Sequence, residues 1–262
     1  MIEAYERVMA ARAKGRPTSM SFIENIFTDF TEMHGDRRFA DDKAIVAGIA
    51  RLNGMPVTVI GLEKGVELKE KVARNFGSAH PEGYRKALRQ MKLAEKFHRP
   101  VICFVDTSGA YCGIAAEERG QGQAIAENLM EMMTLKTPVV SILIGEGGSG
   151  GALGLAVADQ VWMLENSYYS AISPEGCASI LWKDAALADE AAECLKLTAE
   201  DALSLGIIER IIPEMNGDFE VVYPMMEAAI WEQLSTAGEL SIDQLLEQRW
   251  QRFRKFGARQ QA

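Results

Sequence analysis

The sequence contains little of what metal-binding, membrane and nucleic-acid-binding proteins depend on. It has four cysteines and three scattered histidines in 262 residues, and no cysteine pair has the C-x-x-C spacing of a zinc ribbon. No apolar run approaches the roughly 18–20 residues of a membrane-spanning helix, and no basic, apolar leader is apparent. The formal net charge of -9 disfavours nucleic acid, because Lys and Arg supply most of that affinity. These absences predict a cytoplasmic protein with reduced thiols and with no metal in this chain, no DNA and no membrane partner.

Glycine, by contrast, is concentrated in one place. Residues 145–154 read Gly-Glu-Gly-Gly-Ser-Gly-Gly-Ala-Leu-Gly and follow the apolar run 139–144. Glycine inside a helix or strand costs about 0.5–1 kcal/mol relative to alanine, so this cluster needs a compensating reason. If the chain turns here into a helix, the first N–H groups of that helix lack partners and can bind a phosphate or a developing oxyanion. The alternative is a close packing corner between strand and helix, and the residues alone leave both explanations open.

A weak internal repeat indicates the fold. Residues 55–61, 99–105 and 137–145 each read as a buried strand with a proline near its start, and the prolines are 44 and then 38 residues apart. Loops and helix-periodic segments follow, with helices predicted over 81–97 and 120–133. Such strand, loop and helix units predict a mostly parallel sheet covered by helices.

The remaining segments are predicted from local pattern. Helices are expected up to Lys14, over 21–33 and from the glycine cluster to about Ala158; strands over 160–164 and 168–172; and helical stretches over 181–250, interrupted near Ile211. No linker is long enough to divide the chain into independent domains.

A second loop follows the strand at 99–105. Residues 106–113 read Asp-Thr-Ser-Gly-Ala-Tyr-Cys-Gly. Because ligands gather at the carboxyl ends of parallel strands, we expect this loop and the glycine cluster to face one pocket. Asp106 could act as an acid or base, although a carboxylate there more often binds loop N–H groups. A nucleophilic Cys112 is disfavoured because no histidine lies near it in the sequence.

One segment departs from the acidic average. Between Lys64 and Arg99 there are ten Lys and Arg and four Glu. This excess could hold or guide a polyanionic ligand. It could equally be a solvated helix face whose charges have salt-bridge partners, an explanation that suits the residues after Arg85 better than residues 64–74.

Three segments resemble the carboxyltransferase alpha subunit of bacterial acetyl-CoA carboxylase. They are residues 75–88, residues 145–153, and residues 172–183 with the motif Ile-Ser-Pro-Glu-Gly-Cys-Ala-Ser-Ile-Leu-Trp-Lys. The resemblance extends from about Arg16 to Phe253, which is nearly the whole chain.

The resemblance implies an α/β fold of the crotonase type, which is a spiral of ββα units with flanking N- and C-terminal helices. It also implies one carboxyltransferase domain over residues 1–262. Within it we expect flanking helices at 1–35, the crotonase-type core at 36–214 and a C-terminal helical interface region at 215–262.

The implied activity is transfer of a carboxyl group from carboxybiotin on its carrier protein to acetyl-CoA, which forms malonyl-CoA for fatty acid biosynthesis. The implied partners are a beta subunit that bears a zinc ribbon, in an alpha2-beta2 assembly, together with the biotin carboxyl carrier protein and biotin carboxylase. This division of labour accounts for the lack of zinc-ligand cysteines in this chain.

The resemblance also implies site residues. The N–H groups of Gly150 and Gly151 would hold the ureido oxygen of biotin and stabilise the charge that develops there, so the mechanism needs no side-chain nucleophile. The residues implied to line the same pocket are Gly109, Ala110, Tyr111, Gly148 and Ser149.

The chain departs from the family pattern in two places. Ser108 and Cys112 replace the two usual prolines of the 106–113 loop, which would loosen the pocket wall. Residues 61–66 read Gly-Leu-Glu-Lys-Gly-Val where Gly-His-Gln-Lys-Gly-Arg is usual, so one positive charge is lost.

Three alternative functions remain open at this point. The first keeps the fold and the use of biotin, as a decarboxylase or a carboxylase of another acyl-CoA. The second is a non-catalytic scaffold or regulatory subunit. The third is a stand-alone CoA hydratase or hydrolase, for which no well-placed pair of carboxylates is apparent.

Overall fold

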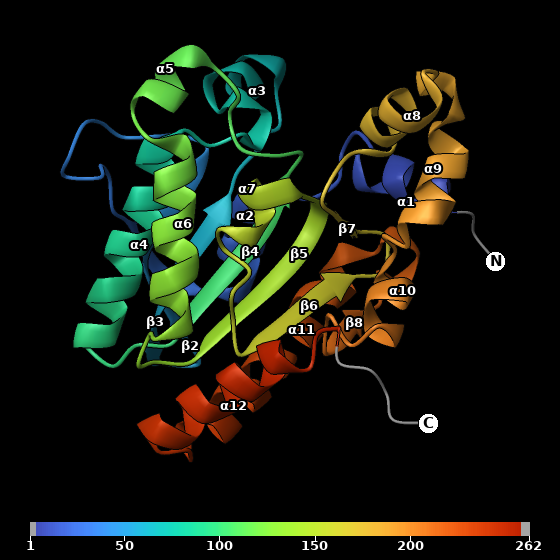
Figure 1. Ribbon diagram of the computed structural model, residues 1–262. Coiled ribbons are helices and arrows are strands. Elements are labelled where there is room, and N and C mark those ends of the chain that lie inside the picture. The colour runs from blue at the N-terminus through green and yellow to red at the C-terminus, as the bar shows by residue number, and fades with distance from the viewer. Residues whose placement is uncertain (1–3, 258–262) are drawn as a thin grey trace.

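A sheet of eight strands forms the centre of the molecule, whose computed structural model describes residues 4–257 (Figure 1). The strands are β1 (Thr28–Glu32), β2 (Ile45–Leu52), β3 (Met55–Leu62), β4 (Val101–Thr107), β5 (Val139–Gly148), β6 (Gln160–Leu164), β7 (Tyr168–Ser170) and β8 (Arg210–Ile212). Their order is β1-β2-β3-β4-β5-β6-β8, and β7 pairs with β5 off this path. The first three strands are antiparallel neighbours, whereas the pairs from β3 onward are parallel. The predicted mostly parallel sheet is confirmed.

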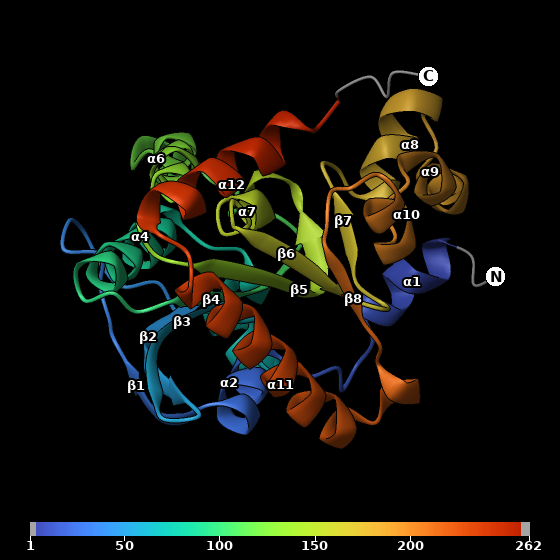
Figure 2. The same cartoon turned by 90° about the horizontal axis from the view of Figure 1, so that it is seen from below.

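Helices cover both faces of this sheet. They are α1 (Ala4–Ala11), α2 (Ser19–Ile26), α3 (Leu68–Ala73), α4 (Pro81–Lys96), α5 (Ile114–Glu118), α6 (Gln121–Met133), α7 (Ser149–Leu153), α8 (Pro174–Trp182), α9 (Ala188–Leu195), α10 (Ala199–Ser204), α11 (Phe219–Gly238) and α12 (Ile242–Arg254). α4 and α6 lie side by side on one face, and α2 and α11 cover the other, as Figures 1 and 2 show from two directions.

Strand β4 shows why both faces need a helical layer. All of its residues are buried. Val101, Cys103 and Val105 pack in the cluster that includes α4 and α6. Ile102 and Phe104 belong to the opposite cluster, with α2 and α11. Alternate side chains point to opposite faces of a strand, so a continuous apolar run is stable only when both faces are covered.

The strand, loop and helix repeat is confirmed by the structure. Pro100 and Pro138 stand directly before β4 and β5, and their carbonyl oxygens accept hydrogen bonds from the N–H groups of Thr58 (2.9 Å) and Val101 (2.8 Å) in the neighbouring strands. A proline at this position therefore supplies an acceptor to the ladder while the N–H that it lacks is not needed there. The two predicted helices correspond to α4 and α6, with ends that agree to within one residue.

The N-terminal prediction is wrong in part. The helix expected over 21–33 ends at Ile26, and β1 follows it. Thr28, Phe30 and Thr31 favour strands, and Thr31 pairs with Ile49 of β2. Neither β1 nor β2 is among the predicted strands. β1 depends on pairing with a segment that is distant along the chain. β2 does have a local signal that the predictions missed, since Asn53-Gly54 joins it to β3 as a two-residue hairpin turn.

The boundaries after the glycine cluster also differ from the predictions. α7 ends at Leu153, well before the expected end near Ala158. The interruption near Ile211 is the strand β8, whose residue Ile211 pairs with Met163 of β6. The strand predicted over 160–164 matches β6, whereas the one predicted over 168–172 ends at Ser170.

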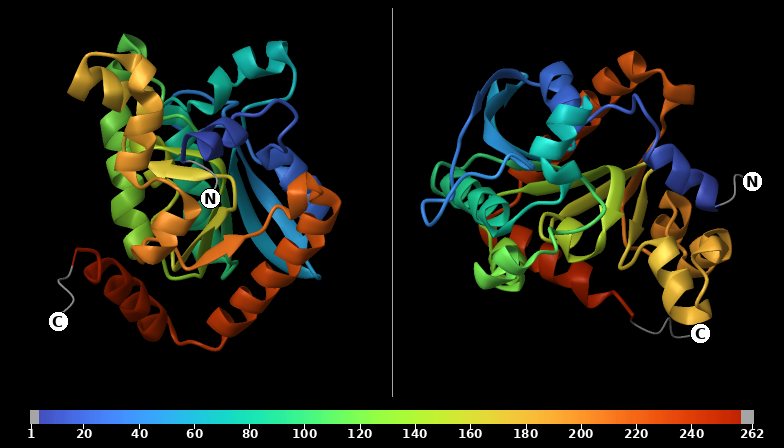
Figure 3. Two further views of the ribbon diagram at one scale, coloured as in Figure 1. Left: turned by 90° about the vertical axis from the view of Figure 1, so that its right-hand side faces the viewer. Right: turned by 90° about the horizontal axis from the view of Figure 1, so that it is seen from above.

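The C-terminal helices follow one another around the outside of the fold (Figure 3). α11 buries Val222, Met226, Ile230 and Leu234, which recur every four residues along one helix face. α12 is anchored by Arg249, whose side chain is fully buried. Its guanidinium donates to the Asp159 carboxylate at 2.7 and 2.8 Å and to backbone carbonyls at the end of α6 and beyond. Both helices are thus packed against the core.

Candidate active site

The glycine cluster is partly strand and partly helix. β5 continues through residues 145–148, and Gly147 pairs with Thr107 of β4 and Tyr169 of β7. The chain then enters α7 at Ser149, which has a left-handed φ of 55° although it is not glycine. We call residues 145–151 the glycine corner.

Close packing accounts for several glycines of this corner. A Cβ atom at Gly148 would lie 2.2 Å from the carbonyl oxygen of Ser108, and one at Gly151 would lie 2.4 Å from the backbone nitrogen of Ala110. At Gly145 it would lie 2.5 Å from a carboxylate oxygen of Asp106. No side chain can occupy such positions without moving backbone or a buried carboxylate, so the packing-corner explanation holds here.

Gly150 is different from these glycines. A Cβ atom there would meet only Ile125 within 4 Å, at the ordinary contact distance of 3.8 Å. Gly150 also lines a cavity of about 550 Å³, which we call the apolar cavity. Its other large side chains are Leu153, Tyr169, Leu205, Ile207 and Phe256. Packing therefore does not explain glycine at position 150. The close approach of a ligand would explain it.

Backbone donors from two loops gather at the glycine corner. Within residues 4–257, the N–H groups of Gly150, Gly151 and Ala110 make no hydrogen bond. Because Ala110 lies against Gly151, the two predicted loops do meet. The loop at 109–111 does not contribute to the lining of the apolar cavity, however, and neither do Gly148 and Gly151, whereas Ser149 and Gly150 do. N–H groups fixed in advance in this way can stabilise an oxygen that becomes negatively charged.

Backbone carbonyl groups in α7 and just after it accept hydrogen bonds from side chains of the covering helices α4 and α6. The Tyr84 hydroxyl of α4 donates to the carbonyl of Gly151 at 3.2 Å, and the Asn128 amide of α6 donates to the carbonyl of Gly154 at 3.0 Å. Both side chains are fully buried. Sequence reasoning missed these two residues, although Tyr84 stands in a segment that carries the family resemblance.

The loop at 109–111 is fixed from behind. The Tyr111 N–H donates to the carbonyl of Ala79 at 3.0 Å, and the Gln121 amide donates to the carbonyls of Ala79 (2.8 Å) and Tyr111 (2.9 Å). The ring of His80 stacks on that of Tyr111 with 4.1 Å between centroids. The loop is therefore an ordered wall, even though Ser108 and Cys112 replace the usual prolines.

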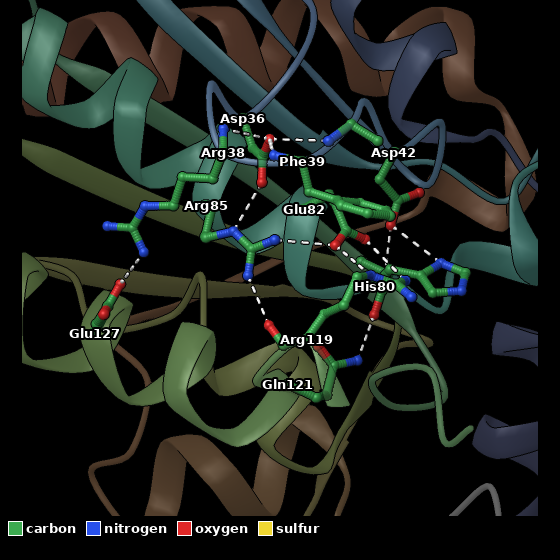
Figure 4. Close-up of polar contacts among 12 residues, drawn as sticks. Asp36, Arg38, Phe39, Asp42, His80, Glu82, Arg85, Arg119, Gln121 and Glu127 are labelled. Atoms are coloured by element: carbon green, nitrogen blue, oxygen red, sulfur yellow. Dashed lines mark hydrogen bonds and ion pairs between the residues drawn. The ribbon is translucent and has the colours of Figure 1, made fainter. Parts of the chain in front are cut away.

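Charged residues behind this wall form the network in Figure 4. Arg85 donates to Asp36 at 2.8 Å and to Glu82 at 2.9 Å, and Arg119 donates to Glu82 at 2.7 Å. The Arg85–Asp36 pair connects α4 to the segment before β2, and the Arg119–Glu82 pair connects α4 to the turn between α5 and α6.

Internal salt bridges also explain why basic residues are concentrated after Arg85. The ammonium of Lys86 is fully buried and donates to Asp41 at 2.6 Å, and Arg85 is held by Asp36 and Glu82. These two charges have salt-bridge partners, as the alternative explanation predicted, and are not available to a polyanion. The expected solvated helix face is wrong for them, because the Lys86 and Arg85 side chains are only 0% and 10% exposed.

Asp106 binds groups of the protein itself. Its Oδ1 accepts the backbone N–H of Glu146 at 2.8 Å and the ammonium of Lys64 at 2.6 Å. Asp106 thus binds a backbone N–H, as one interpretation expected, but this N–H belongs to strand β5 and not to a loop. Cys112 is exposed. Over residues 4–257, no cluster of His, Cys, Asp and Glu could hold a metal ion, and no helix in that range is long and apolar enough to cross a membrane.

Comparisons with known proteins agree with the resemblance stated above. The family described as acetyl co-enzyme A carboxylase carboxyltransferase-like matches residues 1–257. The chain is similar to the acetyl-coenzyme A carboxylase carboxyl transferase subunit alpha of Ruminiclostridium cellulolyticum, with 66% identity over 256 residues that cover 98% of each chain.

Solved structures with a similar fold are more distant in sequence. Transcarboxylase 12S superposes with a TM-score of 0.66 at 18% identity over 84% of this chain. The beta subunit of P. aeruginosa geranyl-CoA carboxylase superposes with a TM-score of 0.69 at 15% identity over 93%. This chain spans less than half of each of those subunits, 44% and 46% of their lengths. These likenesses confirm the predicted crotonase-type fold.

Proposed function

The chain belongs to the acetyl-CoA carboxylase carboxyltransferase-like family, and we propose that its glycine corner and apolar cavity form its half of the carboxyltransferase active site. It is the alpha subunit of the carboxyltransferase of acetyl-CoA carboxylase, an enzyme of fatty acid synthesis. Its substrates are an acyl-CoA and a biotin-linked carboxyl donor, and the alpha designation implies a beta partner.

The finer assignment is that carboxybiotin on its carrier protein is the donor, acetyl-CoA the acceptor and malonyl-CoA the product. When bound, carboxybiotin supplies the carboxyl group that is transferred. The N–H groups of Gly150 and Gly151 would hold the ureido oxygen of the biotin ring and would stabilise negative charge that develops there. Gly148, Ser149 and the loop of Gly109, Ala110 and Tyr111 keep these donors in place.

One observation carries this assignment. Gly150 combines an unpaired N–H, within the described residues 4–257, with an open position for a Cβ atom on the wall of the apolar cavity. The cavity volume of about 550 Å³ exceeds what a bicyclic ring needs, and its apolar walls suit the hydrocarbon part of such a ring. Donors that are fixed before the reaction require no reorganisation during it, and each contributes roughly 10²–10³ in rate in comparable sites.

Partners are proposed on the same basis. The beta subunit, in an alpha2-beta2 assembly, completes the CoA side of the site and carries the zinc ribbon. The biotin carboxyl carrier protein delivers the donor, and biotin carboxylase recharges it.

We also propose the domain division that the resemblance implies, with a flanking region at 1–35, a core at 36–214 and an interface region at 215–262. The flanking region is not helical throughout, because β1 within it is a strand of the central sheet. Exposed apolar side chains on the outer faces of α11 and α12 support the interface. Trp231, Ile242 and Trp250 are 38%, 44% and 48% exposed, although the opposite faces of both helices are packed on the core.

Reconstitution tests this function. Malonyl-CoA formation is measured with this chain, the beta subunit, carboxylated carrier protein and acetyl-CoA, and then with each component omitted. Propionyl-CoA and butyryl-CoA serve as alternative acceptors. We expect activity that requires both subunits and prefers acetyl-CoA. Turnover by this chain alone, or a preference for another acyl-CoA, contradicts the shared site or the acetyl assignment respectively.

A further inference from the structure

A group of charged side chains lies at the carboxyl ends of the central strands, beside the glycine corner. Its members come from five different parts of the chain, and we call them the strand-end cluster. They are Arg12 after α1, Lys64 after β3, Asp106 in β4, Glu146 in β5 and Tyr168 in β7. The side chains of Lys64, Asp106 and Glu146 are only 18%, 7% and 9% exposed.

Lys64 joins the ends of three neighbouring strands. Its Nζ lies 2.6 Å from Oδ1 of Asp106 and 2.7 Å from Oε1 of Glu146. The same Asp106 oxygen accepts the backbone N–H of Glu146 at 2.8 Å. One ammonium thus holds together two carboxylates that would otherwise repel each other, and it does so where β3, β4 and β5 end.

Glu146 is the residue on which the cluster converges. Its Oε2 accepts hydrogen bonds from the Tyr168 hydroxyl (2.7 Å) and from Nε of Arg12 (2.8 Å). Arg12 continues the connection to Glu175 of α8 at 2.6 Å. Burial by itself would raise the pKa of Glu146, but the charge of Lys64 and these hydrogen bonds outweigh it and lower that pKa to about 2.

The cluster is joined directly to the backbone of the glycine corner. Glu146 is itself a corner residue, and the missing Cβ of Gly145 provides the space that the Asp106 carboxylate occupies. Between Glu146 and the donors at Gly150 and Gly151 there are only three residues. A shift of the Glu146 backbone therefore moves the strand end from which the donors project.

Lys64 does not reach the apolar cavity. Together with Asp106 and Glu146 it lines a second cavity of about 510 Å³, which we call the charged cavity. The Lys64 ammonium is already paired with both carboxylates, so this ammonium is not available to a phosphate or carboxylate of a ligand. Among the described residues, Lys71 is the lysine of this cavity that forms no salt bridge.

We propose that Lys64 is a positioning residue for carboxyl transfer, an inference that rests on the proposed function of Gly150 and Gly151. It holds Asp106 and Glu146 together and thereby fixes the orientation of the corner N–H groups toward the ureido oxygen. It touches neither substrate. Its loss consequently lowers kcat and leaves the KM for acetyl-CoA unchanged, because the donors act on charge that appears during the reaction.

The variant Lys64→Met tests this proposal in the reconstituted complex with the beta subunit and carboxylated carrier. We expect kcat at pH about 8 to fall roughly 10²-fold, the loss that follows from misplacing reacting groups by about 1 Å. The KM for acetyl-CoA stays within about twofold of the wild-type value. Lys64→Arg retains the positive charge and recovers a large part of the rate.

The dependence of kcat on pH separates positioning from a general loss of structure. In Lys64→Met, Asp106 and Glu146 face each other without their shared cation, with Arg12 and Tyr168 still bound to Glu146 and Glu175 beyond Arg12. Like charges at this distance raise the pKa of one member of the pair. We therefore expect the deficit of Lys64→Met relative to wild type to shrink as the pH falls from about 8 to about 6.

Lys92→Met is the matched control. Lys92 also bridges two carboxylates, Glu95 of α4 and Glu131 of α6, but far from the glycine corner. Its substitution should leave kcat, KM and the pH profile unchanged. If Lys64→Met fails to fold or assemble, the double variant Lys64→Met with Asp106→Asn removes the charge conflict and keeps an acceptor for the Glu146 N–H. It should assemble with a kcat that is below the wild-type value, because the Lys64 bridge is still missing, but by less than the roughly 10²-fold expected of Lys64→Met.

Several results overturn the proposal. They are wild-type kcat in Lys64→Met or in the double variant, a rise in KM with kcat intact, and a deficit that does not change with pH. Gly150→Val is measured in parallel, so that the two proposals can fail separately. Gly150→Val keeps the N–H at position 150 but fills the open space beside it. Full activity in this variant therefore removes the proposed approach of the ring to Gly150, and with it the donor assignment, whereas an inactive Gly150→Val beside a normal Lys64→Met removes the positioning role alone.

Discussion

On one side of the glycine corner Gly150 opens onto the apolar cavity, and on the other Lys64, Asp106 and Glu146 line the charged cavity. The apolar side has room for a ring and N–H groups without partners among residues 4–257. The charged side has carboxylates and cations that already satisfy one another. The charged side therefore holds the glycine corner in place, while the apolar side is open to a reacting ligand. Substitutions on the two sides should therefore affect different measurements.

The largest effect on stability is expected at Gly151. In Gly151→Val the new Cβ would lie 2.4 Å from the Ala110 nitrogen, and both groups belong to backbone that is held on either side. We expect the free energy of unfolding to fall by about 3 kcal/mol or more, at the upper end of the usual cost of overpacking. Gly150→Val should change it by less than about 1 kcal/mol. Urea denaturation of the two variants measures both values, and equal losses would contradict the distinction between these neighbours.

A smaller effect is expected at Glu146 and should depend on pH. Because the folded-state pKa of Glu146 is lowered to about 2 from its model-peptide value of 4.5, its ionised form stabilises the folded state above pH about 4.5 and this contribution is lost as the pH falls toward 2. At neutral pH it amounts to about 3 kcal/mol. Glu146→Gln should be less stable than wild type at pH 7, and the gap should narrow at pH about 3.5. A gap that is constant between these pH values would show that Glu146 is not held as a charged group.

How much of this could be predicted from the sequence differs between the fold and the site. β4, β5, α4 and α6 follow from continuous apolar runs and from helical periodicity, which are local signals. β1 does not, since it exists through its pairing with β2. β2 is predictable from the Asn53-Gly54 hairpin turn that joins it to β3. The crotonase-type arrangement is predicted through the family resemblance and not through any local pattern.

Within the site, the sequence places the glycine cluster correctly but cannot separate its members. Gly150 and Gly151 are adjacent and identical in type, and only the distances to Ala110 and Ile125 distinguish them. Lys64 and Glu146, by contrast, are 82 positions apart, so no local pattern in the sequence indicates their contact. The one available hint is that Glu146 is the single charged residue inside a run of small ones.

The most direct test of the role of Gly150 is the rate of malonyl-CoA formation by Gly150→Val in the reconstituted complex, compared with Gly122→Val. Gly122 is a helical glycine of α6 outside the proposed interface region, and a Cβ atom there would meet nothing within 4 Å, so the pair controls for the substitution itself. We predict that Gly150→Val folds and assembles with the beta subunit but loses roughly 10²-fold or more in kcat/KM, because the valine side chain keeps the ring away from the N–H donors, while Gly122→Val keeps the wild-type rate. A folded, assembled Gly150→Val with full activity would contradict the claim that this glycine serves the transferred group.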